Sequence, residues 1–292
     1  MRNIAAVFVC LAVAVAAPAS AQRKVEEVRP LNPDGWVQID NLAGSVQVVG
    51  WDSPQVEITG VLGKNVRDIE ISGDEQELEI YVDVPEHADD LESELTIRVP
   101  INASVAVETV SATVQVEGVT GPVDVESVSG WVKVADRPSE LSVETVSGEI
   151  SVAFASLSTG LASVSGSIVV EDAAGQLDAV TVSGDIEIRQ GLVDSASFET
   201  VSGNTTFLAD ISGRGELDVE SMSGTVTLVV SPGISAEFDI STFSGGISNA
   251  IGPEARRTNQ YTPEQELSFT TGGGGAQVSI ETFSGTVNIT TR

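Results

Sequence analysis

The sequence of 292 residues has few of the side chains that perform most chemistry near neutral pH. It contains one histidine, His87, and one cysteine, Cys10, and aromatic residues make up 4%. Acid-base catalysis, nucleophilic catalysis and metal binding rely mainly on imidazoles, thiols and clustered carboxylates. The composition therefore predicts a protein that is not an enzyme, with no catalytic residues, no metal site and no cofactor.

Positive charge is also scarce. Lys and Arg total 14 against 43 Asp and Glu, which gives a formal net charge of -29. This charge repels phosphate backbones and anionic lipid headgroups, so nucleic acids and membrane attachment through a basic patch are excluded. Hydrophobic residues reach 41%, which is enough to build a core and argues against disorder.

The N-terminus has the pattern of a secretory signal. Arg2 precedes an apolar run at residues 4–17, and small residues follow Pro18 at positions 19–21. We expect cleavage after Ala21 and a mature protein in the periplasm or outside the cell. A membrane anchor is the alternative, but a run of about 14 apolar residues is shorter than the roughly 20 that span a bilayer. No later segment is long and apolar enough to cross a membrane.

A six-residue pattern of the type Val-Glu-Thr-Val-Ser-Gly recurs along the chain. The first residues of its copies are Val107, Val125, Val143, Leu161, Ala179, Phe198, Val219, Ile240 and Ile280. The first five copies start at a constant interval, and the longer intervals between the later copies indicate insertions. A constant period of ~18 residues predicts a repeat architecture.

Within one unit, residues 141–144 and 149–152 alternate between apolar and polar side chains, which is typical of half-buried strands. Ser147 and Gly148 lie between these runs and predict a corner. Val146 is apolar where the alternation would leave it outside. We therefore expect a bend near Thr145 that turns Val146 inward, and the direction of Thr145 stays open.

Two architectures fit such a unit: a chain of antiparallel hairpins, or a parallel β-solenoid with one coil per unit. In a solenoid each residue lies on its counterpart one coil below, ~4.8 Å away, which favours one residue type per position. The repeated Val, Ser and Gly positions meet this condition. We predict an all-β parallel β-solenoid (β-helix) with ~18-residue coils and a rod on the order of 40 Å long.

The predicted organisation has three parts. Residues 1–21 are the signal peptide, and residues 22–106 form an N-terminal β-rich region that serves as a cap or as the first coils. Residues 107–292 form the repeat solenoid, with a polar insertion near 252–265. The segment 41–48 (NLAGSVQV) already echoes the repeat, while Ala112 replaces glycine in the first clear copy and suggests an adapted first coil.

The strings VETVSG, TVSGDIEI and IETFSGTVNI, together with LTIRVPINASVAVETVSA, resemble a bacterial family of exported proteins of unknown function, labelled putative adhesins. The resemblance covers roughly residues 35–292. It implies a parallel β-solenoid in the cell envelope, and it brings no catalytic residues with it.

Three sets of polar residues are candidate sites. An outward column of carboxylates is a candidate for divalent cations or, alternatively, a solvated face: Glu108, Glu126, Glu144, Glu199, Glu220 and Glu281. The segment from His87 to Glu94 gathers an imidazole and four carboxylates and is a candidate metal loop or simply a soluble acidic loop. A column of hydroxyls is a candidate ice-binding array: Thr109, Ser127, Thr145, Ser163, Thr181, Thr200, Ser221, Thr242 and Thr282.

The favoured function is a non-catalytic envelope scaffold or adhesin-like binding protein, with a glycan or protein as its ligand. The alternative is a carbohydrate-active β-helix enzyme with paired carboxylates such as Asp89 and Glu94, although Trp131 is the only Trp or Tyr platform along the repeats. A third hypothesis is end-to-end homo-oligomerisation. It rests on the expectation that the final strand, near residues 288–292, is an exposed edge.

Overall fold

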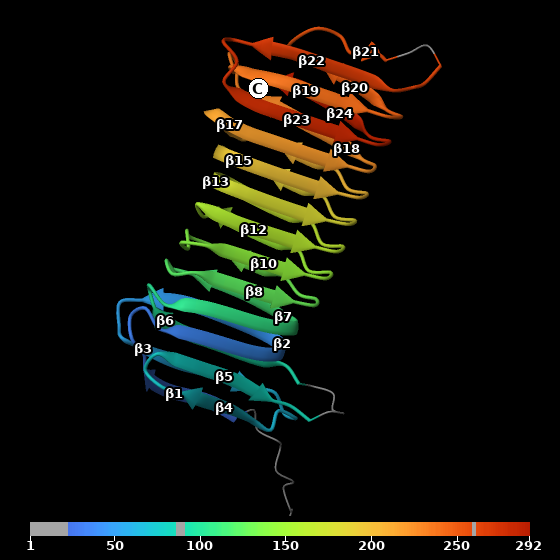
Figure 1. Cartoon of the computed structure of the whole chain (residues 1–292). Helices are drawn as coiled ribbons and strands as arrows, with labels where there is room; N and C mark the ends of the chain where they lie inside the picture. The colour runs from blue at the N-terminus through green and yellow to red at the C-terminus, as the bar shows by residue number, and fades with distance from the viewer. Residues whose placement is uncertain (1–22, 86–90, 259–260) are drawn as a thin grey trace, which may run out of the picture.

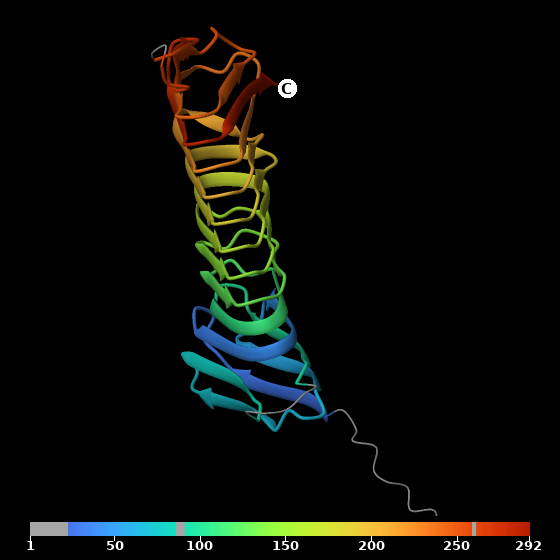
Figure 2. The same cartoon turned by 90° about the vertical axis from the view of Figure 1, so that its right-hand side faces the viewer.

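The computed structural model describes residues 23–85, 91–258 and 261–292. Within these ranges it contains 24 strands and no helix, so the prediction of an all-β chain is confirmed. Accordingly, no helix in this part of the chain is long and apolar enough to cross a membrane. The strands stack into a rod, with the N-terminal part at one end and the C-terminal part at the other (Figures 1 and 2).

The middle of the rod is a stack of parallel, in-register coils. Each coil has a first face, whose strand precedes the Ser-Gly corner, and a second face, whose strand follows it. The strands here are β8 (Val123–Ser127), β9 (Val132–Val134), β10 (Leu141–Thr145), β11 (Ile150–Phe154), β12 (Ser158–Ser163), β13 (Ile168–Thr181) and β14 (Ile186–Ile188). Val143 pairs with Val125 on one side and with Leu161 on the other, which are its counterparts in the two neighbouring repeats. Parallel pairing between counterparts is what stacked coils require, and hairpins would have paired antiparallel.

The following coils keep this pairing but lengthen their connections. They consist of β15 (Gly191–Thr200), β16 (Thr205–Phe207), β17 (Asp210–Ser221) and β18 (Thr225–Val230). Ala179 pairs with Phe198, and Phe198 pairs with Val219. Equivalent residues of successive copies thus still pair with each other where the interval between the copies is longer. The extra residues are accommodated by register shifts after Gly175 and Val193.

At the C-terminal end the coils do not stack in sequence order. The strands are β19 (Ala236–Thr242), β20 (Gly246–Asn249), β21 (Arg256–Arg257), β22 (Gln265–Thr271), β23 (Ala276–Thr282) and β24 (Thr286–Thr291). Ile280 pairs with Val219 on one side and with Ile240 on the other, so the last coil lies inside the stack. The antiparallel strand β22 covers β19 from outside. The expectation that the final strand is an exposed edge is therefore wrong, and end-to-end assembly loses that basis.

The N-terminal end shows the same reversal of order. Its strands are β1 (Arg23–Pro30), β2 (Trp36–Trp51), β3 (Gln55–Leu62), β4 (Asp68–Gly73), β5 (Glu77–Asp83), β6 (Ser93–Pro100) and β7 (Ser104–Glu117). Strand β2 pairs in parallel with β7 on one side and with β5 and β6 on the other. Antiparallel strands close this end, because β4 pairs with β5, and β3 joins β6 to β1.

Two of the N-terminal sequence signals are explained by this arrangement. Asn41 pairs with Thr109, and Gly44 pairs with Ala112, so the segment 41–48 is a true copy of the repeat. Ala112 lies within β7, which continues through the corner as a single strand instead of breaking there. Its methyl group is completely buried. The first clear copy therefore has no glycine because its chain bends without the tight corner of the later coils.

The core is a set of aliphatic columns that run along the rod. Val107, Val125 and Val143 are each at most 1% exposed, and Phe198 occupies the same position further along. Because the backbones are ~4.8 Å apart, each of these side chains packs on its counterpart above and below. The second face adds a parallel column that includes Val132, Ile150, Ile168 and Ile186.

The corners need glycine because the backbones approach one another closely. A Cβ atom on Gly166 would lie 1.8 Å from the carbonyl oxygen of Gly148, and one on Gly184 would lie 1.9 Å from that of Gly166. No side chain fits at such a distance, so the steric limit comes from the coil below rather than from the backbone angles of the glycine itself. The glycine column is therefore a direct consequence of the stacking.

A candidate binding groove along the rod

The first face of each coil ends in three residues, of which the first and third point outward and the second points inward. In the coil of β10 these are Glu144, Thr145 and Val146. Thr145 is 5% exposed and points inward, whereas Val146 is 47% exposed. The expectation that a bend turns Val146 inward is therefore wrong, because the strand keeps its two-residue alternation up to the corner.

The hydrogen bonds of the inward residue explain why this position is occupied by threonine or serine. Thr145 Oγ1 donates a hydrogen bond to the carbonyl oxygen of Gly148 at 2.9 Å, across the corner. In the next coil Ser163 Oγ accepts from the Gly166 N–H at 2.7 Å. Threonine or serine thus satisfies corner backbone groups that would otherwise be buried without partners.

These bonds also bear on the ice-binding candidate. All nine hydroxyl-bearing residues of that column are at most 7% exposed. Some bond one another from coil to coil, as Thr109 Oγ1 does with Ser127 Oγ at 3.0 Å. A buried column cannot offer a flat hydroxyl array to ice, so this candidate is not supported.

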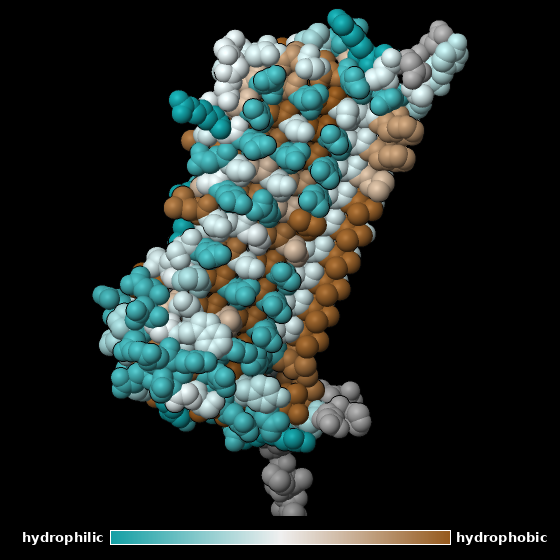
Figure 3. Space-filling model, viewed as in Figure 1, coloured by the Kyte–Doolittle hydropathy of each residue, from teal (hydrophilic) through white to brown (hydrophobic). Residues whose placement is uncertain are grey.

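The outward residues form two columns on either side of the buried hydroxyls. We call the first the acidic column, and it contains the six glutamates predicted from the sequence: Glu108, Glu126, Glu144, Glu199, Glu220 and Glu281. We call the second the apolar ladder, and it contains Val110, Val128, Val146, Val164, Val182, Val201, Met222, Phe243 and Phe283. Every member of the apolar ladder is between 43% and 53% exposed. In Figure 3 this ladder is a stripe along the rod that is brown over most of its length and paler towards the C-terminal end, with white and then teal side chains to one side of it.

A groove runs between the acidic column and the apolar ladder, with the hydroxyl column as its floor. One part, from Tyr81 and Asp40 to Val182, has a volume of about 880 Å³. The next part, from Val180 to Phe283, has a volume of about 510 Å³. Val180 and Val182 line both parts, so the two are consecutive stretches of one groove. With one coil every ~4.8 Å, the groove is on the order of 45 Å long.

The acidic side of the groove is interrupted near its middle. Ala162 and Val180 occupy the positions of the acidic column there, so an apolar stretch separates two acidic stretches. In the first acidic stretch, burial raises the pKa of Glu108 above its ordinary value of 4.5, and the charges of Asp40, Glu126 and Asp124 add to this effect. Each carboxylate thus disfavours the ionisation of its neighbours, and a cation placed between them would relieve the repulsion.

The structure describes the acidic column in full but only part of the candidate metal loop from His87 to Glu94. Among the described residues, no group of three or more His, Cys, Asp or Glu side chains lies close enough to hold a metal ion. The stretch from His87 to Asp90, including Asp89, falls outside the described residues. Glu94 lies on β6, where it pairs with Val61 of β3. The proposed pairing of Asp89 with Glu94 therefore stays a prediction.

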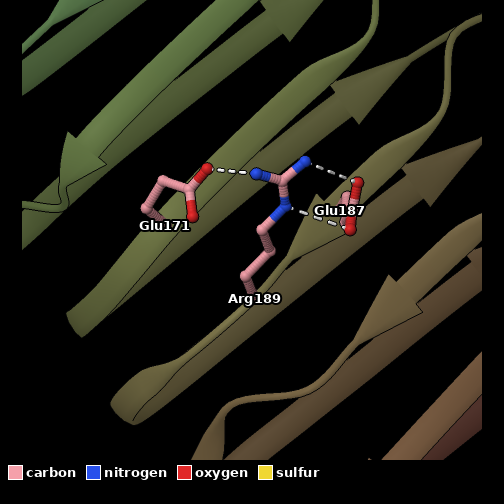
Figure 4. Close-up of polar contacts among 3 residues, drawn as sticks. All are labelled: Glu171, Glu187 and Arg189. Atoms are coloured by element: carbon pink, nitrogen blue, oxygen red, sulfur yellow. Dashed lines mark hydrogen bonds and ion pairs between the residues drawn. The ribbon is translucent and has the colours of Figure 1, made fainter.

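The second face carries ordinary surface ion pairs. Arg189 follows β14 and binds Glu171 of the coil below and Glu187 of its own coil, where Nε lies 3.1 Å from Oε1 (Figure 4). The hydrogen bond and charge of Glu187, together with the charge of Glu171, raise the pKa of the Arg189 guanidinium. Exposed pairs of this kind contribute little to stability. Trp131 lies outside the groove, with the Lys133 ammonium 5.8 Å from its ring centre.

The corner serines have a structural role, as expected for residues that form a corner. Ser129 Oγ donates to the Val110 carbonyl oxygen at 3.1 Å, and Ser165 Oγ donates to that of Val146 at 3.2 Å. Each bond joins a corner to the coil below. These hydroxyls hold the apolar ladder in position, since their acceptors are the carbonyl groups of ladder residues.

Sequence reasoning found the acidic column but missed the apolar ladder as a surface. The signal was present: Val146 stands two residues after Glu144, and simple alternation puts both outside. Its apolar character suggested burial instead. Apolar character at an outward position in every copy is better interpreted as an exposed interaction surface.

Solved structures similar to this chain include proteins of Parabacteroides and Bacteroides. A protein of Parabacteroides distasonis described as a "putative adhesin" matches over 92% of this chain and 98% of its own, with 14% identity and a TM-score of 0.53. A "putative adhesin" of Bacteroides fragilis matches over 92% and 98%, with 12% identity and a TM-score of 0.47. A "putative lipid binding protein" of Parabacteroides distasonis matches over 91% and 96%, with 11% identity and a TM-score of 0.45. Of these three, only the first has a TM-score above one half, and its low identity means that it supports the fold alone.

No curated protein matches this chain. A family of unknown function does: its model, described as Toastrack DUF4097, aligns with residues 44–232. The aligned segment begins in β2 and ends just after β18, so it covers the stacked coils and the part of the groove that they form. The chain belongs to the Toastrack DUF4097 family.

Proposed function

We propose that the protein is a non-catalytic, adhesin-like binding protein of the cell envelope, built as a parallel β-solenoid that displays a long ligand groove. The observation that carries this proposal is the apolar ladder. Nine apolar side chains, each about half exposed, form one stripe along the rod. Soluble proteins rarely expose contiguous apolar surface of this extent, and where they do it marks an interaction site.

The repeat supports a binding role for the ladder rather than a structural one. The core is already filled by the columns that contain Val143 and Ile150, which are completely buried. Val146 therefore adds little to the burial of apolar surface within the chain. What it provides is a regular apolar edge along the groove, which an extended ligand can cover over many coils.

The rest of the organisation follows from the same proposal. Residues 1–21 act as a signal that is cleaved near Ala21, and the mature protein works in the periplasm or at the cell surface. Residues 22–106 supply the cap and the first coils, and residues 107–292 supply the repeat with its polar insertion near 252–265. In this scheme the groove begins within the first region, at Tyr81 and Asp40, and continues through the second.

The test uses the mature chain, residues 22–292, and isolated envelope fractions. We expect the protein to co-sediment with envelope material, and the triple change Val128→Ser, Val146→Ser and Val164→Ser to weaken this association at least tenfold. Val28→Ser is the matched control, because Val28 is also 47% exposed but does not line the groove. Equal association of the triple variant and the control would contradict a role for the ladder. Turnover of an envelope polymer that one point mutation abolishes would contradict the non-catalytic part.

A further inference from the structure

We propose that the groove takes a proline-rich, cationic segment of a partner protein, laid along the rod axis in the polyproline II conformation. This deepens the proposed binding function and rests on it. The juxtaposition that suggests it is an apolar edge and an acidic edge running side by side, at the constant spacing of the coils. Four properties of the groove select this occupant.

The first property is its repeat length. Coils recur every ~4.8 Å, so two coils span ~9.6 Å. A polyproline II helix advances about 3.1 Å per residue with three residues per turn, or about 9.3 Å per turn. The two repeats differ by only about 0.3 Å per turn. An α-helix, with a pitch of about 5.4 Å, would lose about 0.6 Å of register at every coil. A polyproline II guest can therefore place the same side chain against every second coil over the whole groove.

The second property is the state of the backbone around the groove. Strand β10 is paired on both sides, with β8 and β12, so its backbone groups are used within the rod. The floor hydroxyls are also engaged, as the bond from Thr145 Oγ1 to the Gly148 carbonyl oxygen shows. A guest β-strand would find no row of free donors and acceptors along this strand. The polyproline II backbone needs none, because it remains solvated and is already ordered before binding.

The third property is charge. The acidic column presents Glu108, Glu126 and Glu144 on three successive coils, and Asp40 precedes them. With a net charge of -29, the chain repels a second copy of itself and anionic headgroups, but it attracts Lys and Arg. In a polyproline II guest with a cation at every third residue, each cation faces the acidic column while the proline rings face the apolar ladder.

The fourth property is the break in the acidic column. Ala162 and Val180 replace glutamate at the middle of the groove, and Val180 is itself 41% exposed. Both edges are apolar there. The prolines of the guest can fill this stretch from both sides, which adds apolar contact where the ionic contacts are absent.

The experiment measures the affinity of the mature chain for three synthetic peptides by fluorescence anisotropy. The first is (Pro-Pro-Lys)5, the second is (Gly-Ser-Lys)5 with the same charge on a flexible backbone, and the third is (Pro-Pro-Glu)5. We expect (Pro-Pro-Lys)5 to bind at least tenfold more tightly than (Gly-Ser-Lys)5, and (Pro-Pro-Glu)5 not to bind. Equal binding of the two lysine peptides would overturn the proposal, since it would show charge attraction alone.

Matched variants locate the binding. Val146→Ser with Val164→Ser should weaken (Pro-Pro-Lys)5 at least tenfold, and Glu126→Gln with Glu144→Gln should weaken it and reduce its salt dependence. The controls Val28→Ser and Glu149→Gln, which lie outside the groove, should change nothing. Circular dichroism of each variant verifies that the β structure is intact. Binding that survives in both double variants would overturn the assignment to the groove.

Failure of this inference is distinguishable from failure of the proposed function. If the ladder variants lose envelope association while (Pro-Pro-Lys)5 does not bind, the binding function stands and the polypeptide occupant is wrong. Binding of palmitate in competition with envelope material would then assign the groove to an acyl chain. If neither envelope association nor peptide binding responds to the ladder, both proposals fall.

Discussion

The rings of Phe243 and Phe283 stack with their centres 4.9 Å apart and their planes 12° from parallel. Phe283 is the later residue in the chain, yet it belongs to the coil nearer the middle of the rod, because β23 pairs with both β17 and β19. The last coil is therefore inserted between two earlier ones. This places the C-terminal strand in the interior of a sheet, where it is bonded to β18 and β20.

Removing a core side chain from the last strand should destabilise the protein strongly. Ile289 is completely buried on β24, and Ile289→Ala should lower the free energy of unfolding by about 2–5 kcal/mol, since it leaves a cavity between two coils. Urea denaturation measures this. A loss below about 0.5 kcal/mol, equal to that of the exposed control Thr290→Ala, would show that the terminal strand is frayed and not inserted.

The corner glycines should tolerate no side chain. In Gly166→Ala the new methyl group would lie 1.8 Å from the Gly148 carbonyl oxygen, so two coils must separate. We expect a loss of at least about 2 kcal/mol, measured by thermal or urea unfolding.

Gly160→Ala is the matched control for this prediction. Gly160 lies on β12 with no atom within 4 Å of the position that a Cβ would take. Alanine there should be neutral or should stabilise by up to about 1 kcal/mol, because it restricts the unfolded chain. Equal effects of the two substitutions would contradict the close approach of the corners.

Buried hydroxyl side chains should be sensitive to substitution only where they are hydrogen-bonded, as a comparison of the hydroxyl column with the second face can show. Thr145→Val removes the donor to the Gly148 carbonyl oxygen and leaves that buried acceptor without its partner, at a cost of about 1–3 kcal/mol. Thr205 is 1% exposed, and its Oγ1 has no hydrogen-bond partner. Thr205→Val should therefore be neutral or stabilising, because valine continues the column of Ile186 and Val226. A larger loss at Thr205 than at Thr145 in urea denaturation would contradict this assignment.

The pKa of Glu108 should lie above 4.5, since burial and the charges of Asp40, Glu126 and Asp124 all disfavour its ionised form. A raised pKa means that the folded protein binds this proton more tightly than the unfolded chain does. The corresponding stability is present below the unfolded pKa and is lost as pH rises through the folded pKa. Because Glu108 is only slightly buried, solvent and salt keep this contribution small.

An NMR titration of the Glu108 side-chain carboxyl measures this shift directly. Asp40→Asn should lower the pKa of Glu108 towards 4.5 without reaching it, since burial makes the larger contribution. A Glu108 pKa at or below 4.5 in the unsubstituted protein would contradict the crowding of carboxylates in the groove.

Much of the fold is readable from the sequence, because stacking makes it repetitive. The interval that separates Val125, Val143 and Leu161 along the chain is also the pairing offset of their strands. The glycine column likewise recurs because each corner glycine lies against the backbone of the coil below. Each residue type recurs because its nearest neighbour is its own copy, so local pattern and tertiary structure carry the same information.

The ends and the groove were harder to predict for two different physical reasons. The long interval between Ile240 and Ile280 gives the length of an excursion, but it does not say on which side of the earlier coil the chain returns. For Val146, the hydrophobic character of the side chain outweighed the alternation of the strand. Its outward direction follows from that alternation, which continues unbroken up to the corner.

Because the chain turns back at both ends, its first and last coils in sequence order are not the outermost layers. The two terminal closures are thus independent of how many units lie between them. Duplication or loss of one repeat unit would lengthen or shorten the molecule, and with it the span of the groove, while leaving both closures unchanged. The length of the rod is therefore a heritable property that duplication within the gene can change in steps of one coil.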